Sequence, residues 1–456
     1  MADSRAPLLS VEEALDRLVA AIDGPLPAEE VALADALDRV LAAPVRSTID
    51  LPPWDNSAMD GYALHAADTA GASPASPVRL RVVGEVRAGG SAAIEVPPGC
   101  AVRIATGAPV PPTADAVLPV ESTLDPGGAG TSTNAGAGGT GVRGAAAIRF
   151  RAGETLADFC LAIAAARPSD HIRRRGGDVL AGAEVLGAGT RLGPSQIALA
   201  AAVGRGTVGV HRRPVVGVLS TGDELREPGQ DPGDAGIPDA NRPGLLAACT
   251  AAGAATVDLG IARDSLYSVL GALRPALDRV DAVIVSGGVS VGPYDVVRDA
   301  FEAIGSVELW RVAIQPGKPF AFGRSNPRER DGRRAFLFGL PGNPVSTLVT
   351  FELFVRPVLR RLAGDPERNG TLDRAITDDP LSSAAGRRGF LRVRVARLPD
   401  GSPERDERGR LRVSLSGAQG SHVLTAMAAA DALAVVPESV GRIEPGDEVE
   451  VRWLAR

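Results

Sequence analysis

The first fifty residues combine a helix-start signal with apolar residues at helical spacing. Ser10 and Glu13 form the S-x-x-E pattern of a capping box, in which each side chain bonds the other residue's backbone. Apolar residues then recur three and four positions apart over residues 11–22, and again over residues 33–41 before Pro44. The pattern predicts two short amphipathic helices at the start of the chain.

Residues 51–167 carry the pattern of β-structure instead. Short β-type runs at 78–86, 100–104 and 116–120 are separated by Gly and Pro. Residues 126–147 consist almost entirely of Gly, Ala, Ser and Thr, which bury too little apolar surface to order a segment. We expect a small β-rich module that contains a flexible loop at 126–147.

From residue 211 onward, continuous apolar runs alternate with helical segments. The runs at 215–219, 281–285 and 336–338 are typical of parallel strands that are buried on both faces. Helical segments are predicted at 243–252, 266–279, 295–304 and 344–362. This alternation indicates a doubly wound α/β domain over residues 211–363.

After Gly364 the apolar residues alternate with polar ones. Runs at 391–395, 411–415 and 449–453 show a period of two, and a charged turn at 400–410 joins the first two runs. Residues 364–456 are therefore expected to form a small antiparallel β-domain.

Composition and charge exclude several classes of function. The chain has 456 residues, 45% of them hydrophobic, so about three folded domains are expected. The net charge of −6 argues against a nucleic-acid-binding protein, and no uncharged apolar run is long enough to predict a membrane span. Three cysteines lie far apart without a CxxC pair, which predicts neither disulfides nor a zinc site. We expect a soluble cytoplasmic protein.

Three strands of the α/β domain lead directly into loops with ligand-binding residue types. These loops are Leu219–Leu225, Val285–Asp295 and Phe338–Ser346. Ligands bind at the carboxyl ends of such strands, where glycines allow close backbone approach and helix N-termini bind anions. The carboxylates of Asp223, Glu224 and Asp295 would repel an anion unless Mg²⁺ lies between them. Any one loop is also compatible with a simple turn, and Asp223 with a helix cap.

Longer motifs then connect the whole chain, from about residue 8 to 455, with one known family. The motifs are Asp55–Ala63, Ala105–Pro109, Ala114–Val117, Ser220–Leu225, Ser286–Gly292, Pro316–Phe320, Leu340–Val345 and Gly420–Leu424. In this order they resemble the MoeA family, which includes the E domain of gephyrin. The first motif, DNSAMDGYA, matches the family's segment without a mismatch.

The resemblance implies four domains and an elongated homodimer. Residues 1–50 and 168–210 would form a discontinuous N-terminal domain, and residues 51–167 the β-rich module. Residues 211–363 would form the molybdopterin-binding-like α/β domain and residues 364–456 a small β-barrel. The active site would lie between the α/β domain of one subunit and the β-rich module of the other.

The implied activity is that of a molybdopterin molybdenumtransferase. Such an enzyme inserts molybdate into adenylylated molybdopterin, releases AMP and requires Mg²⁺. A transient contact with molybdopterin adenylyltransferase is also implied, whereas neither nucleic acid nor a membrane is expected as a partner.

The family's functional residues are carried over by motif position. Asp295 would be the central catalytic residue, together with Glu224 and, from the partner subunit, Asp60 and Thr106. The metal ligands would be Glu224, Asp264, Asp295 and Asp178. The substrate-binding residues would be Ser220, Thr221, Gly222, Asp223, Ser286, Gly287, Gly288, Lys318, Pro319, Pro341, Gly342, Asn343, Ser346, Arg388 and Ser421. Of these, Lys318, Ser346, Arg388 and Ser421 would bind molybdate, a dianion that favours cationic and hydroxyl donors.

Several of these residues keep a purely structural interpretation. Asp178 is compatible with a surface turn, Asp264 with a helix N-cap, and Ser346 with a solvent-facing helix position. Lys318 is the only lysine among 49 basic residues, so either a selected or a chance position is possible.

The chain also departs from the family pattern in three places. Gly176-Gly-Asp178 lacks one carboxylate, Gln315-Pro-Gly317 lacks one lysine, and residues 126–160 are longer than their equivalent. Two rival functions stay open at this point. A molybdopterin adenylyltransferase would carry Gly-Gly-Thr-Gly where this chain has Gly287-Gly-Val-Ser290, and a non-catalytic scaffold would not need the acidic residues that are present.

Overall fold

The computed structural model describes residues 8–124, 158–288, 296–365 and 370–454. The loop predicted at 126–147 and the candidate catalytic residue Asp295 both lie outside these residues. The described chain divides into two compact units. The first contains Met1–Ala43, Gly187–Pro194 and Thr207–Arg456, and the second contains Pro44–Leu186 and Ser195–Gly206.

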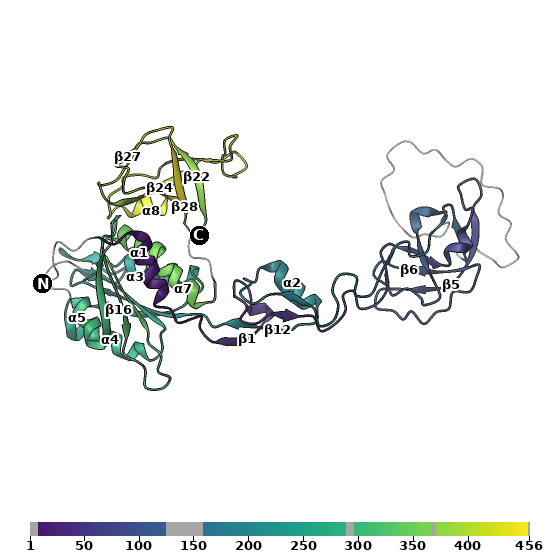
Figure 1. The fold of residues 1–456 in the computed structure, drawn as a ribbon, viewed down its shortest axis with the longest axis horizontal. Helices are drawn as coiled ribbons and strands as arrows, with labels where there is room; N and C mark the ends of the chain where they lie inside the picture. The colour runs from purple at the N-terminus through teal and green to yellow at the C-terminus, as the bar shows by residue number, and fades with distance from the viewer. Residues whose placement is uncertain (1–7, 125–157, 289–295, 366–369, 455–456) are drawn as a thin grey trace. The chain divides into compact units, whose positions relative to one another are not determined.

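A six-stranded sheet forms the centre of the first unit, in the order β16-β13-β17-β21-β20-β18 (Figure 1). In that order the strands are Ala255–Ala262, Val215–Thr221, Ala282–Ser286, Phe336–Leu340, Pro319–Ser325 and Gly305–Arg311. The first four strands are parallel, and β20 and β18 are antiparallel to their neighbours. The parallel strands are buried because helices cover both faces, as the apolar runs predict.

Helices pack on both faces of this sheet (Figure 1). They are α1 Val11–Ala20, α3 Asn241–Ala251, α4 Leu266–Leu277, α5 Val296–Ile304, α6 Pro344–Thr350 and α7 Arg356–Leu362. The α4 and α5 side chains share one apolar cluster, and the side chains of α1, α3, α6 and α7 share another. A π-helical segment, Phe351–Val355, joins α6 to α7 within the single long helix expected from the sequence. The doubly wound α/β fold is confirmed.

Of the two helices predicted at the start of the chain, the structure contains only the first. Helix α1 begins at the predicted capping box, with both reciprocal hydrogen bonds formed. The helix predicted over 33–41 is wrong: Leu33–Asp35 form one 3-10 turn, η1, and Asp38 has a positive φ of 62°. A left-handed residue cannot continue an α-helix. Val40 and Leu41 instead form β-bridges with Arg191 and Val210, so long-range pairing overrides the local spacing.

The strand β1, Ala28–Ala32, joins the N-terminal segment to a distant part of the chain. It pairs antiparallel with β12, Thr207–His211, which lies far along the sequence. Its sequence, AEEVA, has few residues with strong β preference, so only the distant partner identifies it as a strand.

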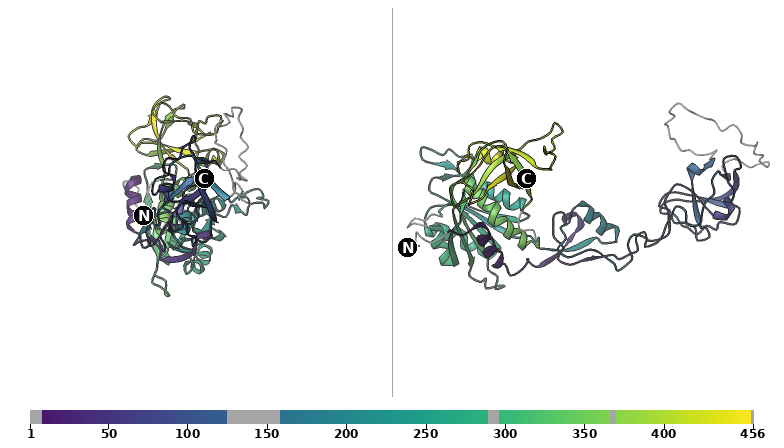
Figure 2. Two further views of the ribbon diagram at one scale, coloured as in Figure 1. Left: turned by 90° about the vertical axis from the view of Figure 1, so that its right-hand side faces the viewer. Right: turned by 45° about the horizontal axis from the view of Figure 1, so that its top comes forward.

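The C-terminal part of the first unit is a closed barrel (Figures 1 and 2). Its strands are β22 Leu372–Thr377, β24 Arg388–Val395, β25 Leu411–Leu415, β26 Ala432–Val436 and β28 Glu448–Trp453. The order β24-β25-β22-β28-β26 closes through an additional β24–β26 pairing. The pairs are antiparallel except β22 with β25, which is parallel. The predicted β-barrel is therefore confirmed, with one parallel pair that the period of two could not reveal.

The second unit contains the predicted β-rich structure. Its main sheet has the order β7-β4-β6-β5-β9-β8. In that order the strands are Ala116–Pro119, Gly61–Leu64, Cys100–Ile104, Val78–Val86, Phe159–Ala162 and Thr123–Leu124. Gly61 is required at this crowded position because a Cβ atom there would lie 2.0 Å from the carbonyl oxygen of Leu118. Helix α2, Pro194–Ala202, lies outside the sheet.

In the described part of the chain, none of the helices has the length and apolarity that a membrane span requires.

Candidate active site

The sheet order places three loops side by side. Strands β13, β17 and β21 are adjacent and parallel, and Ser220 is in register with Ser286, which is in register with Leu340. Their following loops therefore share one edge, as the sequence predicts for ligand-binding loops of an open α/β sheet.

Glycines allow close approach between these loops: Gly287 of the loop after β17 lies against Thr221 of β13, and Gly342 of the loop after β21 lies against Gly287. Gly287 and Gly288 have φ values of 96° and 63°, in the left-handed region that favours glycine. A Cβ atom on Gly287 would lie 2.3 Å from the Thr221 carbonyl oxygen, and one on Gly342 would lie 3.6 Å from the Gly287 Cα. Any larger residue at 287 would separate the β13 and β17 loops.

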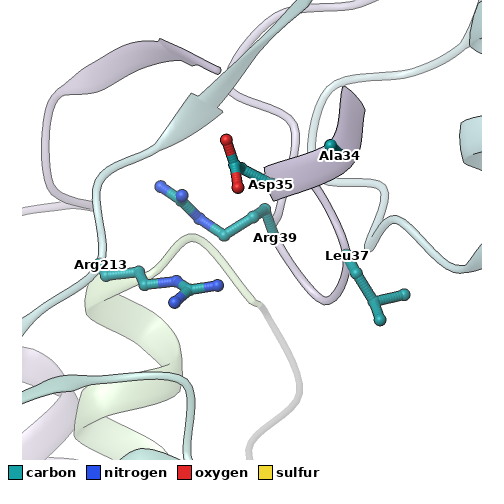
Figure 3. A pocket seen from close by; sticks show the side chains of 5 residues that line it. All are labelled: Ala34, Asp35, Leu37, Arg39 and Arg213. Atoms are coloured by element: carbon teal, nitrogen blue, oxygen red, sulfur yellow. The ribbon is translucent and has the colours of Figure 1, made fainter. Parts of the chain in front are cut away.

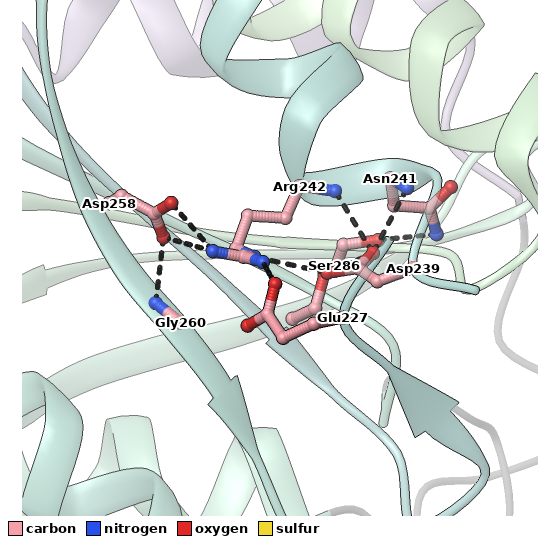
Figure 4. Close-up of polar contacts among 8 residues, drawn as sticks. Glu227, Asp239, Asn241, Arg242, Asp258, Gly260 and Ser286 are labelled. Atoms are coloured by element: carbon pink, nitrogen blue, oxygen red, sulfur yellow. Dashed lines mark hydrogen bonds and ion pairs between the residues drawn. The ribbon is translucent and has the colours of Figure 1, made fainter. Parts of the chain in front are cut away.

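A polar network ties the three loops together at the start of α3 (Figure 4). The Asn241 amide donates a hydrogen bond to Ser286 Oγ at 2.9 Å. It donates another to the Gly342 carbonyl at 2.6 Å. Ser220 Oγ donates to Asp239 Oδ1 at 3.0 Å. The Ser220 and Ser286 side chains are 0% and 1% exposed. These two predicted substrate-binding hydroxyls therefore hold the loops to one another instead of facing solvent.

Arg242 anchors the same network. Its guanidinium contacts Asp239 at 3.1 Å, Asp258 at 2.5 Å and Glu227 (Figure 4). Burial opposes the charge, but the hydrogen bonds to Asp258 and Asp239 raise the pKa of Arg242. Sequence reasoning missed Asp239, Asn241 and Arg242, although an acidic residue and an amide directly before a predicted helix are a usable signal.

Oxygen ligands gather where β13 and β16 end. Thr221 Oγ1 donates to Asp264 Oδ1 at 2.8 Å, and the Asp264 backbone N–H donates to Asp223 Oδ1 at 3.4 Å. The Glu224 carboxylate lies over Gly222, 2.7 Å from where a Cβ atom would stand. Ser265, not Asp264, caps helix α4, which removes the N-cap interpretation of Asp264. Asp223 lies in a turn with no helix to cap.

These groups suit Mg²⁺ in kind, because hydroxyl and carboxylate oxygens are its usual ligands. Among the described residues, however, no three acidic, histidine or cysteine side chains come together closely enough to hold a metal ion. Asp295 lies outside the described residues, and Asp178 is an exposed turn residue of the second unit. The metal-ligand set stays a prediction.

A cavity of about 450 Å³ lies where the α/β domain meets the barrel. It is lined by Gln315, Pro316, Gly317, Pro319, Pro341, Gly342, Asn343, Ser346, Arg387, Gln419, Gly420 and Ser421. Asn343 Nδ2 donates to Ser421 Oγ at 3.1 Å, which joins the two walls. Ser346 is 3% exposed and faces this cavity, so it is not a solvent-facing helix residue. Six residues predicted for substrate binding are thus brought together: Pro319, Pro341, Gly342, Asn343, Ser346 and Ser421.

The arginine at this cavity is not the one expected. Arg387 lines it, whereas Arg388 lies in ion pairs with Glu12 and, at 3.1 Å, with Glu438. Successive side chains at the start of a strand point in opposite directions, so only one of two neighbouring arginines can face the cavity. The role of Arg388 in molybdate binding stays a prediction.

Lys318 lies directly between cavity-lining residues. Within the described part of the chain its ammonium has no hydrogen-bond or ion-pair partner, and burial together with the charges of Arg311 and Arg387 lowers the pKa of Lys318. Lys318, Arg311 and Arg387 therefore lie close enough for their positive charges to interact. Gln315, which replaces a family lysine, accepts a hydrogen bond from the Ala384 N–H at 2.8 Å and so holds the loop that carries Arg387.

Asp60 and Thr106 form a pair in the second unit. Asp60 Oδ1 accepts hydrogen bonds from the Thr106 N–H at 2.6 Å and from its hydroxyl at 2.8 Å. The backbone bond, and then the hydroxyl bond, lower the pKa of Asp60. The two predicted residues thus form one exposed acidic site on this unit.

Another cavity, of about 270 Å³, contains none of the predicted residues (Figure 3). It is lined by Ala34, Asp35, Leu37, Arg39 and Arg213, near η1. Its Arg39 guanidinium already bonds Glu29 and, at 2.8 Å, the His211 carbonyl.

The fold and site together define a class: multidomain proteins with a doubly wound α/β domain, a β-rich module and a terminal barrel that lines a polar cavity together with the α/β domain. Comparison with known families narrows this class. "MoeA N-terminal region (domain I and II)" matches residues 9–204, "Probable molybdopterin binding domain" matches residues 217–361, and "MoeA C-terminal region (domain IV)" matches residues 374–454.

Individual relatives agree over nearly the full length. "Molybdopterin molybdenumtransferase 1" of Mycobacterium tuberculosis is 34% identical and covers 98% of this chain and 99% of its own. "Molybdopterin molybdenumtransferase 2" of the same species is 37% identical over 92% and 94%. A crystal structure of the MoeA protein of Pyrococcus horikoshii has a TM-score of 0.74 and 32% identity, covering 98% of this chain and 99% of its own. The chain belongs to the MoeA family.

Proposed function

We propose that this chain is a molybdopterin molybdenumtransferase, which inserts molybdate into adenylylated molybdopterin with release of AMP. The printed activity of relatives that span nearly the whole chain supports this. The observation that carries the proposal is the cavity at the barrel, which Arg387, Ser346 and Ser421 line. Lys318 lies between two lining residues in the chain, and its ammonium interacts electrostatically with Arg387. A tetrahedral dianion needs this combination of positive charge and short-range donors.

The chemistry has two parts without any change of oxidation state. Water cleaves the phosphoanhydride bond, so that AMP leaves and molybdopterin keeps its own phosphate. The two dithiolene sulfurs bond molybdenum and displace one oxo group of molybdate, which leaves with the two thiol protons as water. The cavity residues hold the oxyanion while the backbone of the three loops holds the pterin end, which lowers the entropic cost of the encounter.

Mg²⁺ is part of the proposal. It would neutralise charge that develops as AMP leaves, held by Asp264 and Glu224 at the end of β13. The grouping of Thr221, Asp223, Glu224 and Asp264 oxygens supports this placement. Asp295, which follows β17, would complete the set.

We further propose that the enzyme is a cytoplasmic homodimer. Asp60 and Thr106 of the partner subunit would complete each active site, and molybdopterin adenylyltransferase would be a transient partner that delivers substrate. The support is the family membership and the Asp60–Thr106 pair, which offers an oriented carboxylate on the second unit.

The test is an AMP-release assay with purified chain and adenylylated molybdopterin. We expect AMP release that requires both molybdate and Mg²⁺, and sulfate should not replace molybdate in forming the product. Asp295→Asn should reduce the rate more than tenfold, which corresponds to a rise of about 1.4 kcal/mol in the activation free energy. The exposed Asp299→Asn serves as the control. AMP release without molybdate, or none at all, would contradict the proposal and favour an adenylyltransferase-like or scaffold role.

A further inference from the structure

The amino edge of the central sheet, opposite the three loops of the candidate active site, carries a row of arginines. One residue of each parallel strand is in register with the next: Val216 of β13, Ala282 of β17 and Phe336 of β21. An arginine stands three positions before each of them: Arg213, Arg279 and Arg333. Because neighbouring strands lie about 4.8 Å apart, the register brings these three positions to one edge of the sheet.

Hydrogen bonds next to these arginines hold the three segments together. The Asp281 carboxylate accepts from the Val215 N–H at 2.8 Å, and the Asp281 carbonyl accepts from the Phe336 N–H at 2.9 Å. The buried Arg328 donates to the Val280 carbonyl, which fixes the loop between β20 and β21 at the same edge. The arginine row therefore stands on an ordered base, so little conformational freedom is lost when a partner binds it.

The positive charge of this edge is not balanced locally. Residues 212–214, 278–281 and 328–334 together carry seven arginines and four acidic residues, in a chain whose net charge is −6. Two of the acids are already paired, Asp281 with Arg212 at 2.7 Å and Asp331 with Arg330 at 3.4 Å. Within the described part of the chain, the guanidinium groups of the row itself form neither a hydrogen bond nor an ion pair. They are therefore free to bind an external anionic group.

The chemistry of the edge favours carboxylates of a protein over other polyanions. A guanidinium binds a carboxylate through two parallel hydrogen bonds. The exposed acids Asp278 and Glu329 lie among the arginines and would repel the closely spaced phosphates of a nucleic acid. Among the described residues, none of the exposed large hydrophobic side chains belongs to these segments, so base stacking and membrane insertion have no residue to support them. A protein surface of mixed charge with an acidic excess complements the edge.

We propose that this arginine row is a docking surface for an acidic segment of a partner protein. The inference goes beyond the proposed function and does not rest on it. Strands β13 and β17 have seven and five residues, so roughly 16–23 Å separate the row from the three loops at the other edge. A partner bound at the row leaves those loops accessible, and docking is independent of catalysis.

The probe for the test is a fluorescently labelled deca-glutamate peptide. Its binding to the full chain is measured by fluorescence anisotropy at low ionic strength, where charge pairs are least screened. Combined substitution of the row, Arg213→Glu, Arg279→Glu and Arg333→Glu, should weaken binding at least about tenfold.

The control variant makes the same change of net charge at exposed arginines elsewhere, Arg81→Glu, Arg394→Glu and Arg408→Glu. Its affinity should stay within about threefold of wild type, because distant exposed charges are largely screened. The same three row substitutions to glutamine cover the case in which the glutamate variant does not fold. They remove the charge without reversing it and should weaken binding about threefold.

Equal losses in the row and control variants, or no binding of the peptide by the wild-type chain, would overturn the inference. Tighter binding of an oligothymidylate of equal charge, or of phosphatidylserine vesicles, with the same dependence on the row would also overturn it, because a nucleic acid or a membrane would then be the occupant. AMP release should stay unchanged in the row variant, and a parallel loss would contradict the independence of docking and catalysis. Wild-type chain that binds the peptide but releases no AMP would contradict the proposed function alone.

Discussion

The neighbouring residues Arg387 and Arg388 lie in different environments. Substitutions at the two positions should therefore separate an effect on ligand binding from an effect on protein stability. Arg387 faces the cavity, whereas Arg388 joins Glu12 of α1 to Glu438 of the barrel. We expect Arg387→Gln to weaken molybdate binding about tenfold without lowering Tm. Arg388→Gln should do the reverse and cost about 1 kcal/mol of unfolding free energy, because the Arg388 side chain is 23% exposed and its pairs are partly screened.

Calorimetric binding and thermal unfolding on both variants check this prediction. Loss of molybdate binding in Arg388→Gln with normal binding in Arg387→Gln would instead support the assignment of Arg388 made from the sequence.

Lys318 gives a direct chemical test, because it is the only lysine in the chain. Its lowered pKa means that the neutral, reactive amine forms at lower pH than in an ordinary lysine. An anion in the cavity stabilises the ammonium and raises the pKa again. Amine-reactive labelling followed by mass spectrometry should therefore show Lys318 reacting early in the pH range, with protection by molybdate.

The N-terminal amine is the internal reference for that labelling, since molybdate should not change its rate. The same pKa predicts that molybdate affinity declines as pH rises through the Lys318 pKa, where the ammonium is lost. Lys318→Arg should still bind less well than wild type, because a planar fork does not replace a compact ammonium. Equal labelling with and without molybdate would place Lys318 outside the anion site.

Single residues show where sequence reasoning succeeds and where it stops. It identified Ser346 and Ser421, which do face the cavity, because motifs record which positions stay near a ligand. It also assigned Ser220 and Ser286 to the substrate, although both hydroxyls are buried in the network with Asp239 and Asn241. That network depends on three loops meeting in space, so no local pattern contains it.

At the scale of elements, helix α3 acts on the site through its first residue. Asn241 bonds the β17 end and the loop after β21, and the carbonyl it holds belongs to Gly342 of the cavity wall. Asn241→Ala removes the donor from both partners, so we expect a loss of about 1–2 kcal/mol in stability and severalfold weaker molybdate binding.

Thr250→Ala provides the matched control for this change. Thr250 is exposed on the same helix and bonds only the Leu246 carbonyl within it. Thermal unfolding and molybdate titration should show larger losses of stability and affinity in Asn241→Ala than in Thr250→Ala. Equal behaviour of the two would mean that the loops hold their positions without Asn241.

Elements with a strong local pattern were predictable, and those defined by distant pairing were not. The buried runs at β13, β17 and β21 stand out in the sequence because both faces of a parallel strand are covered. The helix predicted at 33–41 is absent because Val40 and Leu41 are buried where their backbones form β-bridges to residues far along the chain. Helical spacing in a short stretch cannot exclude that origin.

At the scale of the whole molecule, the proposed shared active site predicts complementation between inactive variants. Asp60→Ala and Lys318→Ala alter residues in different units of the chain. If each site takes one residue from each subunit, a mixed dimer keeps one intact site of two. Random mixing by co-expression should then restore about a quarter of wild-type activity.

Each variant alone should stay below a few per cent, which makes the recovery visible. Doubly substituted chains mixed with either single variant form the control, because no site in that mixture contains both Asp60 and Lys318. Absence of recovery in mixed dimers verified by differential tags would show that both residues act within one subunit.

Helix α1 has a consequence for how the protein is made. Its buried face, including Leu18, packs against α7 near Val358, which follows 340 positions later. At about 5–20 residues per second a ribosome needs roughly 20–70 s to cover that distance. During this time the apolar face of this amphipathic helix lacks its partner, so we expect chaperones that bind nascent chains to bind this N-terminal segment. Ribosome-bound chains that end before β21 should show protease cleavage within residues 8–22, and chains that include α7 should not.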